Sequence, residues 1–161
     1  MSEAVDLLTS DHRGEASDFR GQQRVVLPVE QLLPAMTRLH DEWFDLLVDI
    51  TCVDYLNQRG ARDRFGLAYL LADTESAARL TIRVMLNEPQ LTVPTVTGLW
   101  AGANWMEREV WDMFGIRFEG HPDLRRILLP EEFSAHPLRK DYPLRGRHER
   151  ESYEVVGRDS A

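Results

Sequence analysis

The sequence predicts an α+β protein, and three observations carry that prediction. Every second residue over residues 65–71 and 80–86 is a large apolar one, as in strands with one buried face. Apolar residues recur at helical spacing over residues 29–40 and 105–114. The length of 161 residues, 43% of them apolar, is enough for one domain with its own core.

The first third of the chain predicts an arm, a strand, a helix and a second strand. Residues 1–21 are polar and show no sustained period, so we expect a flexible N-terminal arm. The apolar run at residues 24–27 predicts a strand, and the helical pattern that follows runs from residue 29 to about residue 40, with Pro34 inside it. Residues 44–53 are densely apolar with polar residues at alternate positions, which indicates another strand.

The middle of the chain predicts a hairpin followed by a loop. Turn-forming residues at 57–61 separate the strand at 44–53 from the alternating run at 65–71. The two alternating runs are expected to pair as a hairpin across residues 72–79. Two prolines then favour a loop over residues 87–95.

The helix at residues 105–114 carries signals at both ends. Asn104 stands three residues before Glu107, a spacing that predicts an N-terminal cap in which Glu107 reaches back to the first turn. Gly115 stands where a left-handed residue is needed to end a helix. Glu109 lies one turn from two apolar residues, so we expect it to be partly buried.

Beyond Gly115 the composition changes. Residues 116–118 can form a short strand, whereas four prolines between residues 120 and 143 exclude long helices and central strands. An arginine-rich, extended segment of this kind either hangs free or lies along a neighbour. Residues 146–161 are polar, and we expect them to be mobile unless bound.

Charge, hydropathy and cysteine content exclude several classes of protein. A net charge of −8 without a basic patch disfavours nucleic acid as a partner. No window approaches 18 apolar residues and the start lacks a cationic region before an apolar run, so we expect no membrane span and no secretory signal. Cys52 is the only cysteine, which excludes an internal disulfide and a multi-cysteine metal or iron–sulfur site. Any redox cofactor is therefore expected in a partner, and Cys52 itself in a buried, inert position.

Two imidazole–carboxylate neighbours are the candidates for acid–base or metal chemistry. They are His121 with Asp123, and His136 with Asp141. Each histidine precedes a proline in a turn-rich stretch, where an imidazole commonly satisfies backbone groups, and the structural interpretation is the stronger one. None of the sequence motifs GxSxG, GxGxxG, HExxH or the P-loop is present.

The predicted helix at residues 105–114 has its own alternatives. Its three carboxylates are either a functional set or part of a capped helix with an Arg108–Asp112 pair. The tryptophans near this helix either fill the core or anchor a protein interface, and they are Trp100, Trp105 and Trp111.

Residues 104–127 closely resemble the characteristic motif of the 30 kDa subunit of respiratory complex I, which is the C-type subunit of bacterial NADH:quinone oxidoreductase. The family pattern has fixed positions, and this sequence matches all of them: Glu107, Arg108, Glu109, Asp112, Met113, Phe114, His121, Arg125 and Ile127. The similarity continues through residues 136–144 and covers about residues 25–145.

This resemblance implies a fold and a division of the chain. The fold is a two-layer α/β domain with a mixed sheet, followed by an extended, proline-rich C-terminal segment that runs over a neighbouring subunit. Residues 1–21 are then the flexible arm, residues 22–120 the α/β core domain, and residues 121–161 the extended partner-binding segment.

The resemblance also implies a role in electron transport. Family members are cofactor-free peripheral-arm subunits of a proton-translocating NADH:quinone oxidoreductase, on the cytoplasmic face of the cell membrane. They pack against the D-type subunit, of the forty-nine-kilodalton class, and the cluster-bearing B-type subunit, of the twenty-kilodalton class. NADH, FMN, the iron–sulfur clusters and quinone are held by partner subunits, and membrane association is through the complex only.

The residues expected to fix the local fold and the subunit contact, none of them catalytic or metal-binding, are Glu107, Arg108, Glu109, Asp112, His121, Arg125, Arg126, Arg139, Lys140 and Asp141. Related modules occur in plastoquinone-, F420- and hydrogenase-linked complexes, so the electron donor stays open. The alternative from another class is a stand-alone acid–base enzyme that uses His121 with Asp123 or Glu109.

Overall fold

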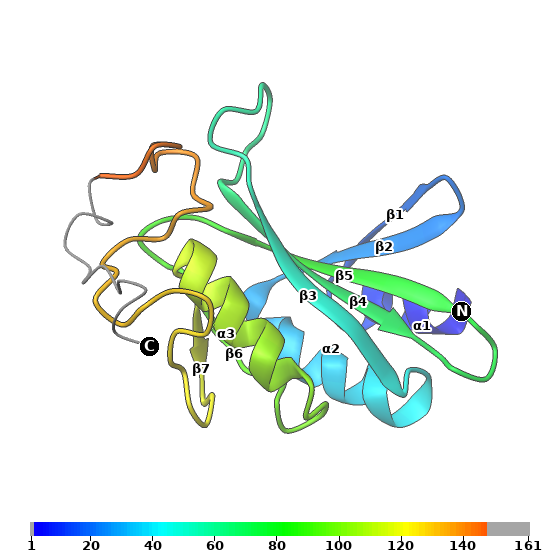
Figure 1. Cartoon of the computed structure of the whole chain (residues 1–161). Helices are drawn as coiled ribbons and strands as arrows, with labels where there is room; N and C mark the ends of the chain where they lie inside the picture. The colour runs from blue at the N-terminus through cyan, green and yellow to red at the C-terminus, as the bar shows by residue number, and fades with distance from the viewer. Residues whose placement is uncertain (1, 148–161) are drawn as a thin grey trace.

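The computed structural model describes residues 2–147 and shows a two-layer α+β domain (Figure 1). Helices lie along one face of a five-stranded mixed sheet, and a second sheet of two short strands stands beside them. The elements in chain order are α1 (Ser2–Ser10), β1 (Glu15–Phe19), β2 (Gln22–Leu27), α2 (Val29–Glu42), β3 (Leu46–Asp54), β4 (Phe65–Ala72), β5 (Arg79–Leu86), β6 (Thr92–Pro94), α3 (Ala103–Phe114) and β7 (Arg117–Glu119).

The main sheet has the strand order β1-β2-β5-β4-β3. β4 and β5 form the expected antiparallel hairpin, β3 pairs antiparallel with β4, and β2 pairs parallel with β5, which makes the sheet mixed. The register places Val25, Ile82, Tyr69 and Ile50 in one row across four strands. All four are buried, so this row belongs to the face that the helices cover.

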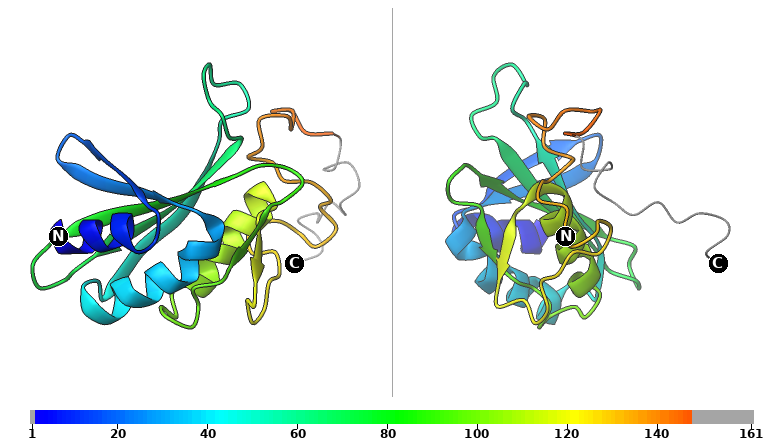
Figure 2. Two further views of the ribbon diagram at one scale, coloured as in Figure 1. Left: turned by 180° about the vertical axis from the view of Figure 1, so that it is seen from behind. Right: turned by 60° about the vertical axis from the view of Figure 1, so that its left-hand side comes forward.

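The other face of the sheet has no helix over it in the described part of the chain (Figure 2). The alternation along β3 shows the difference, since Ile50 and Cys52 are buried whereas Thr51 and Val53 are exposed. β5 alternates in the same way, and one buried face is the arrangement that the period-two pattern predicts. The expected strand at residues 44–53 and helix at residues 29–40 are thus confirmed as β3 and α2, with Pro34 inside α2.

The N-terminal residues differ from the expected flexible arm. Residues 2–10 form α1 and residues 15–19 form β1 at the edge of the sheet. Ala4 and Leu8 are fully buried against the sheet, in the same core cluster as Val25 and Leu27 of β2. The few apolar residues of a single two-turn helix are too short a run to show a period, so only packing against β2 reveals that this segment is ordered.

Residues 87–95, expected to be a loop, contain the short strand β6. It pairs in parallel with β7, and the register joins Val93 to Phe118. A three-residue strand that ends in Pro94 carries no periodic signal, whereas the strand expected at residues 116–118 is confirmed as β7. The expectation for residues 148–161 lies outside the described residues. Within the described part, no helix has the length and apolar character needed to cross a bilayer.

Truncating α1 at its buried contact tests whether this helix is part of the domain. We expect Leu8→Ala to lower the free energy of unfolding by about 2–5 kcal/mol, because it leaves a cavity against β2. Urea unfolding of the full chain measures this, and Asp6→Ala, at an exposed position of the same helix, is the control. Equal midpoints for Leu8→Ala and wild type would show that residues 1–21 behave as an arm.

Candidate functional site

Buried charge is concentrated on α3, the helix that carries the motif. Four charged residues are buried in the described part of the chain, and three of them are Glu107, Arg108 and Asp112 on this helix. Charged side chains are almost never fully buried unless they are paired. Their partners therefore explain what the motif does in the fold.

α3 begins earlier than expected and is not capped by a side chain. The helix starts at Ala103 with Gly102 as its N-cap, so Asn104 lies inside the first turn, and the expected Asn104 cap is wrong. Glu107 does not reach back along the helix either. Its carboxylate points to the loop after β6, where it accepts hydrogen bonds from the N–H of Val96 at 2.8 Å and the hydroxyl of Thr95 at 2.5 Å.

Arg108 and Asp112, one turn apart on α3, hold the extended segment that follows β7. Arg108 donates from Nε to the carbonyl of Arg125 and from Nη2 to that of Arg126, both at 3.0 Å. Asp112 accepts the backbone N–H groups of residues 127–129 on one oxygen, Oδ2, at 2.9–3.1 Å. One helix face thus binds both the carbonyls and the N–H groups of a chain segment that has no secondary structure of its own.

The Asp112 carboxylate is also paired with Arg126. Nη1 of Arg126 lies 2.5 Å from Oδ1, and Nη2 of the same guanidinium donates to the carbonyl of Ala135 at 3.2 Å. Burial by itself would raise the pKa of Asp112, but the backbone N–H bonds from Leu128 and Leu129 together with Arg126 outweigh it and hold the pKa below its ordinary value. The expected Arg108–Asp112 pair is wrong, because each of these side chains binds the segment instead.

The same segment completes the C-terminal end of α3. The last four carbonyls of a helix have no partner within it. Here the N–H of Gly115 binds the carbonyl of Trp111, and groups from residues 136–139 bind the next three. His136 donates from Nδ1 to the carbonyl of Asp112 at 3.0 Å, and the N–H of Leu138 donates to the carbonyl of Met113 at 3.2 Å. Arg139 donates from Nε to the carbonyl of Phe114 at 2.5 Å.

Gly115 is required at this junction for two reasons. Its φ of +75° is in the left-handed region, which confirms the predicted helix end. A Cβ at this position would lie 2.6 Å from the ring of His136. Burial lowers the pKa of His136, so near neutral pH its ring is uncharged and donates from Nδ1 to the helix carbonyl.

Farther along, the segment is attached to the sheet by a charged network. Asp54, buried at the end of β3, accepts the backbone N–H of Lys140 at 2.8 Å. Arg64 lies between Asp54 and Asp141, with Nη2 3.4 Å from the first carboxylate and 2.8 Å from the second. Glu88 accepts from both Arg64 and Arg139. Figure 1 shows the resulting path of the segment, in yellow to orange, around one end of α3.

The two histidine–carboxylate neighbours do not form catalytic pairs. His121 Nδ1 accepts the backbone N–H of Asp123 at 3.0 Å, while the Asp123 carboxylate binds Arg125. His136 binds the helix carbonyl, and Asp141 binds Arg64. The structural interpretation of both histidines agrees with these contacts.

Several motif residues remain at the surface. Glu109 is exposed, so the expectation that it is partly buried is wrong. Arg125 pairs with its neighbour Asp123 on an exposed turn, and the Lys140 side chain is exposed. Trp105 is 61% exposed, with its ring 5.2 Å from the guanidinium carbon of Arg108.

The three tryptophans divide between core and surface. Trp100 is buried and donates from its indole N–H to the carbonyl of Asp45, whereas Trp105 is exposed and Trp111 is half-buried beside Arg126. Leu128 is as exposed as Trp105, at 61%. The exposed groups of this region are held by a buried framework, which makes its surface rigid.

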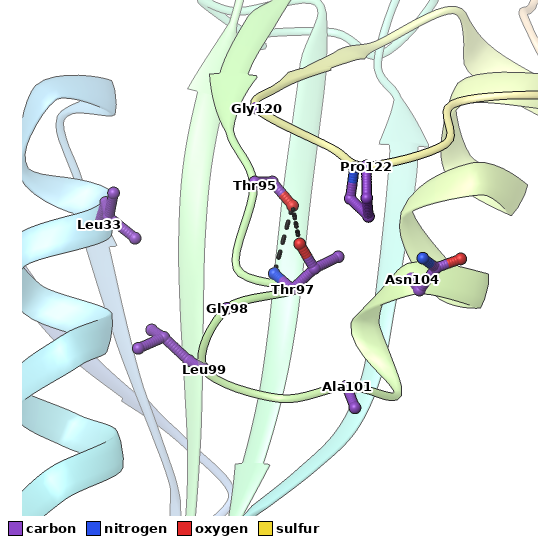
Figure 3. Close-up of a pocket in the computed structure, with 9 residues that line it drawn as sticks. All are labelled: Leu33, Thr95, Thr97, Gly98, Leu99, Ala101, Asn104, Gly120 and Pro122. Atoms are coloured by element: carbon purple, nitrogen blue, oxygen red, sulfur yellow. Dashed lines mark hydrogen bonds between the residues drawn. The ribbon is translucent and has the colours of Figure 1, made fainter.

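A pocket of about 580 Å³ lies near the start of α3 (Figure 3). It is bounded by Leu33 of α2, the loop at residues 95–101, and residues 120–122. Among the residues described, no group of three or more His, Cys, Asp or Glu side chains is placed to hold a metal ion. Cys52 is buried, and burial raises the pKa of its thiol to about 12, as expected of an inert cysteine.

The residues missed by sequence reasoning bind groups that are distant in the sequence. Asp54, Arg64 and Glu88 lie 51 or more residues from the groups of the segment that they bind, and Thr95 lies 12 residues from Glu107. Such contacts leave no period in the sequence. The only available signal was the position of Asp54 at the end of a predicted strand, directly before a turn.

Comparison with known proteins identifies the family to which this fold and site belong. Residues 25–148 match the family described as respiratory-chain NADH dehydrogenase, 30 Kd subunit. The C-type subunit of the NADH-quinone oxidoreductase of Geotalea uraniireducens is 42% identical over 140 residues, which are 86% of this chain and 83% of that protein. Subunit 5 of the Thermus thermophilus NADH-quinone oxidoreductase is 46% identical over 130 residues, covering 77% of this chain and 63% of the relative.

Solved structures agree with the fold. The structure described as "Nqo5 of the trypsin-resistant fragment (1-134) in P63 form" aligns with a TM-score of 0.68 at 37% identity, covering 75% of this chain and 99% of that one. A chain of the archaeal membrane-bound sulfane sulfur reductase aligns with a TM-score of 0.77 at 22% identity over 98% of this chain and 92% of that chain, which shows a shared fold. The chain belongs to the 30 kDa subunit family of respiratory-chain NADH dehydrogenase.

Neutralising Asp112 tests how strongly α3 holds the segment. We expect Asp112→Asn to lower the free energy of unfolding by about 3–5 kcal/mol, because it leaves Arg126 and the N–H groups without their buried carboxylate. Urea unfolding provides the measurement, and trypsin is expected to cleave near residues 125–140 faster in this variant. Glu109→Gln, which removes the same charge from the exposed side of α3, is the matched control and is expected to match wild type.

A side chain at the end of α3 is expected to displace the segment. Gly115→Ala combines the left-handed strain of about 1–2 kcal/mol with a clash against His136, so it should lower the free energy of unfolding by at least that amount. Thermal and urea unfolding measure the loss. Gly60→Ala has a comparable φ of +83° in open space and reports the strain without the clash. A Gly115 variant no less stable than the Gly60 variant would contradict the close contact.

Proposed function

We propose that this chain is a cofactor-free peripheral-arm subunit of a proton-translocating NADH:quinone oxidoreductase. In that role it scaffolds the D-type and B-type partner subunits, which carry the electron transfer from iron–sulfur clusters to quinone. The observation that carries the proposal is the family motif, matched at every fixed position and placed on one helix with the segment bound to it. Relatives at 36–46% identity are named as subunits of NADH-quinone oxidoreductase.

Part of the motif supports this role from the interior. Glu107, Arg108 and Asp112 face inward: Arg108 and Asp112 fix the path of the extended segment, and Glu107 binds the loop after β6. The segment therefore keeps one path over α3, and the residues that it presents to solvent have fixed positions.

Other residues of the same region are available to a partner. Glu109, Arg125 and Lys140 have exposed side chains, and Trp105 and Leu128 also reach solvent. The Trp105 ring lies beside the Arg108 guanidinium, which itself binds the carbonyl of Arg125, so the exposed tryptophan and this turn belong to one region. Tryptophan and arginine are the residues most often dominant at protein interfaces. We assign the contact with a partner subunit to Trp105, Leu128 and Arg125.

The geometry favours a binding role over a catalytic one. The histidines are engaged by backbone groups, and their neighbouring carboxylates bind arginines. From membership of the family we assign NADH, FMN, the clusters and quinone to partner subunits, with membrane association through the complex on the cytoplasmic face. Complexes linked to plastoquinone, to F420 or to a hydrogenase are distinguished from an NADH-linked one by the electron donor that the purified assembly accepts.

The test is purification of the assembly through a tag on this chain, from membranes solubilised in a mild detergent. We expect the D-type and the cluster-bearing B-type subunits to co-purify, together with NADH:quinone oxidoreductase activity. The same subunits without NADH activity would indicate a related complex with another donor. Recovery of the chain alone would contradict the scaffold role and would favour the alternative, a stand-alone acid–base enzyme.

Removing the exposed tryptophan tests the assigned contact surface. We expect Trp105→Ala to reduce recovery of the partner subunits, because truncating an interface tryptophan typically costs about 2 kcal/mol or more, or roughly 30-fold in affinity. Arg125→Glu is expected to act in the same direction. Phe19→Ala, at an exposed aromatic residue of the β1–β2 hairpin, is the control. Native gels of mutant membranes measure assembly, and normal levels of the complex in both variants would contradict this surface assignment.

A further inference from the structure

Glu107 is a buried carboxylate without a cationic partner. It is fully buried, and among the described residues its one ion-pair neighbour is His121, whose Nε2 lies 4.0 Å from Oε2 of Glu107. The contacts of that imidazole define its tautomer. Nε2 faces the carbonyl of Asn104 at 3.2 Å and must donate, while Nδ1 faces the N–H of Asp123 at 3.0 Å and must accept. In this arrangement His121 is neutral.

Tyr69 of β4 is the other titratable group whose electrostatics are coupled to Glu107. Its hydroxyl is buried without a hydrogen-bond partner in the described structure, and burial, followed by the charge of Glu107, raises the pKa of this phenol well above its ordinary value. Tyr69 is therefore neutral as well. An ionised Glu107 lies among neutral groups, and an isolated charge in such a place is costly.

Two threonine hydroxyls link Glu107 to the pocket at the start of α3. Oγ1 of Thr95 lies 2.5 Å from Oε2 of Glu107 and 3.0 Å from Oγ1 of Thr97. Figure 3 shows the two threonines pointing toward one another at the wall of the pocket, which both of them line. The hydroxyl chain thus runs from a fully buried oxygen to a space of about 580 Å³ that solvent can enter.

This hydroxyl chain can satisfy both protonation states of the carboxyl group. When Glu107 is ionised, Thr97 donates to Thr95, and Thr95 donates to Oε2. When Glu107 is protonated, its O–H donates to Thr95, and Thr95 donates to Thr97. In both states Oγ1 of Thr95 also accepts the N–H of Thr97 at 3.2 Å, so it uses one donor and two acceptor sites each time. Rotation of two hydroxyl groups is the only rearrangement needed.

We propose that Glu107 is a reversible proton-binding site in the interior of this subunit, connected to solvent through the hydroxyls of Thr95 and Thr97. Its ligand is a proton, and neither the motif nor the proposed scaffold role requires this property. The site lies where α3, the β6 loop and the turn after β7 meet, so its protonation state acts on the contacts that join these three segments.

Burial raises the pKa of Glu107 to about 7, although the bonds from Thr95 and Val96 lower it. Because the folded-state pKa is above the ordinary value of 4.5, the folded protein holds a proton that the unfolded chain releases. The stability from this site is fully present below pH 4.5 and is lost as the pH rises through about 7.

The direct test is a pH titration of the full chain, with the Glu107 carboxyl carbon followed by NMR between pH 5 and 8.5. We expect one interior carboxyl group to titrate near pH 7, and the signal to be absent from Glu107→Gln and retained in Glu109→Gln. Urea unfolding over the same range is expected to show a decline in stability with rising pH that Glu107→Gln abolishes. A Glu107 carbon that does not titrate in this range, in the wild-type protein, would overturn the proposal without any variant.

The hydroxyl chain has its own test. Thr97→Val removes one hydrogen bond from each protonation state, but only in the protonated state does it leave a donor, the Thr95 O–H, without an acceptor. The protonated state therefore loses more, and we expect the Glu107 midpoint to fall by about half a unit to one unit. Thr92→Val, at an exposed position on β6, is the matched control and is expected to leave the midpoint unchanged. An unchanged midpoint in Thr97→Val would show that Glu107 binds its proton without this chain and would overturn the proposed connection.

Discussion

The carboxylate of Asp112 is the contact on which the C-terminal third of the described structure depends. It is fully buried, and a buried charge is tolerated only where hydrogen bonds replace the lost water. Here three consecutive backbone N–H groups and the guanidinium of Arg126 replace it. These donors belong to a segment with no helix or sheet of its own, so the helix and the segment satisfy each other. Neither has complete hydrogen bonding without the other.

The same reciprocity extends to both ends of the segment. Near its start, Arg108 binds two of its carbonyls, and near its end His136, Leu138 and Arg139 bind the last carbonyls of α3. The motif is therefore largely a set of intramolecular contacts, which present a small group of exposed residues on a rigid support. Rigidity matters for a subunit whose proposed task is to bind partners, because a surface that is already ordered loses less entropy on binding.

Sequence reasoning was most successful where the signal is local. The β4–β5 hairpin, β3, α2 and the end of α3 at Gly115 follow from periodicity and from the conformational needs of single residues. It was wrong about Asn104, which lies within the helix because α3 begins at Ala103, and about residues 1–21, where α1 packs on β2. For α1 the deciding contact is with β2, a part of the chain that no local pattern identifies.

The sequence by itself determined the strands β2, β3, β4, β5 and β7, the two longer helices, the absence of cysteine pairs and the family, because these depend on residue type at short spacing. Only the tertiary structure decided which of the charged motif residues face inward. Glu107 and Glu109 are two residues apart and have the same chemistry, yet one is fully buried and the other is exposed. The physical reason is that burial of a carboxylate depends on donors brought from distant segments, here the Val96 N–H and the Thr95 hydroxyl, which meet Glu107 only after the chain has folded.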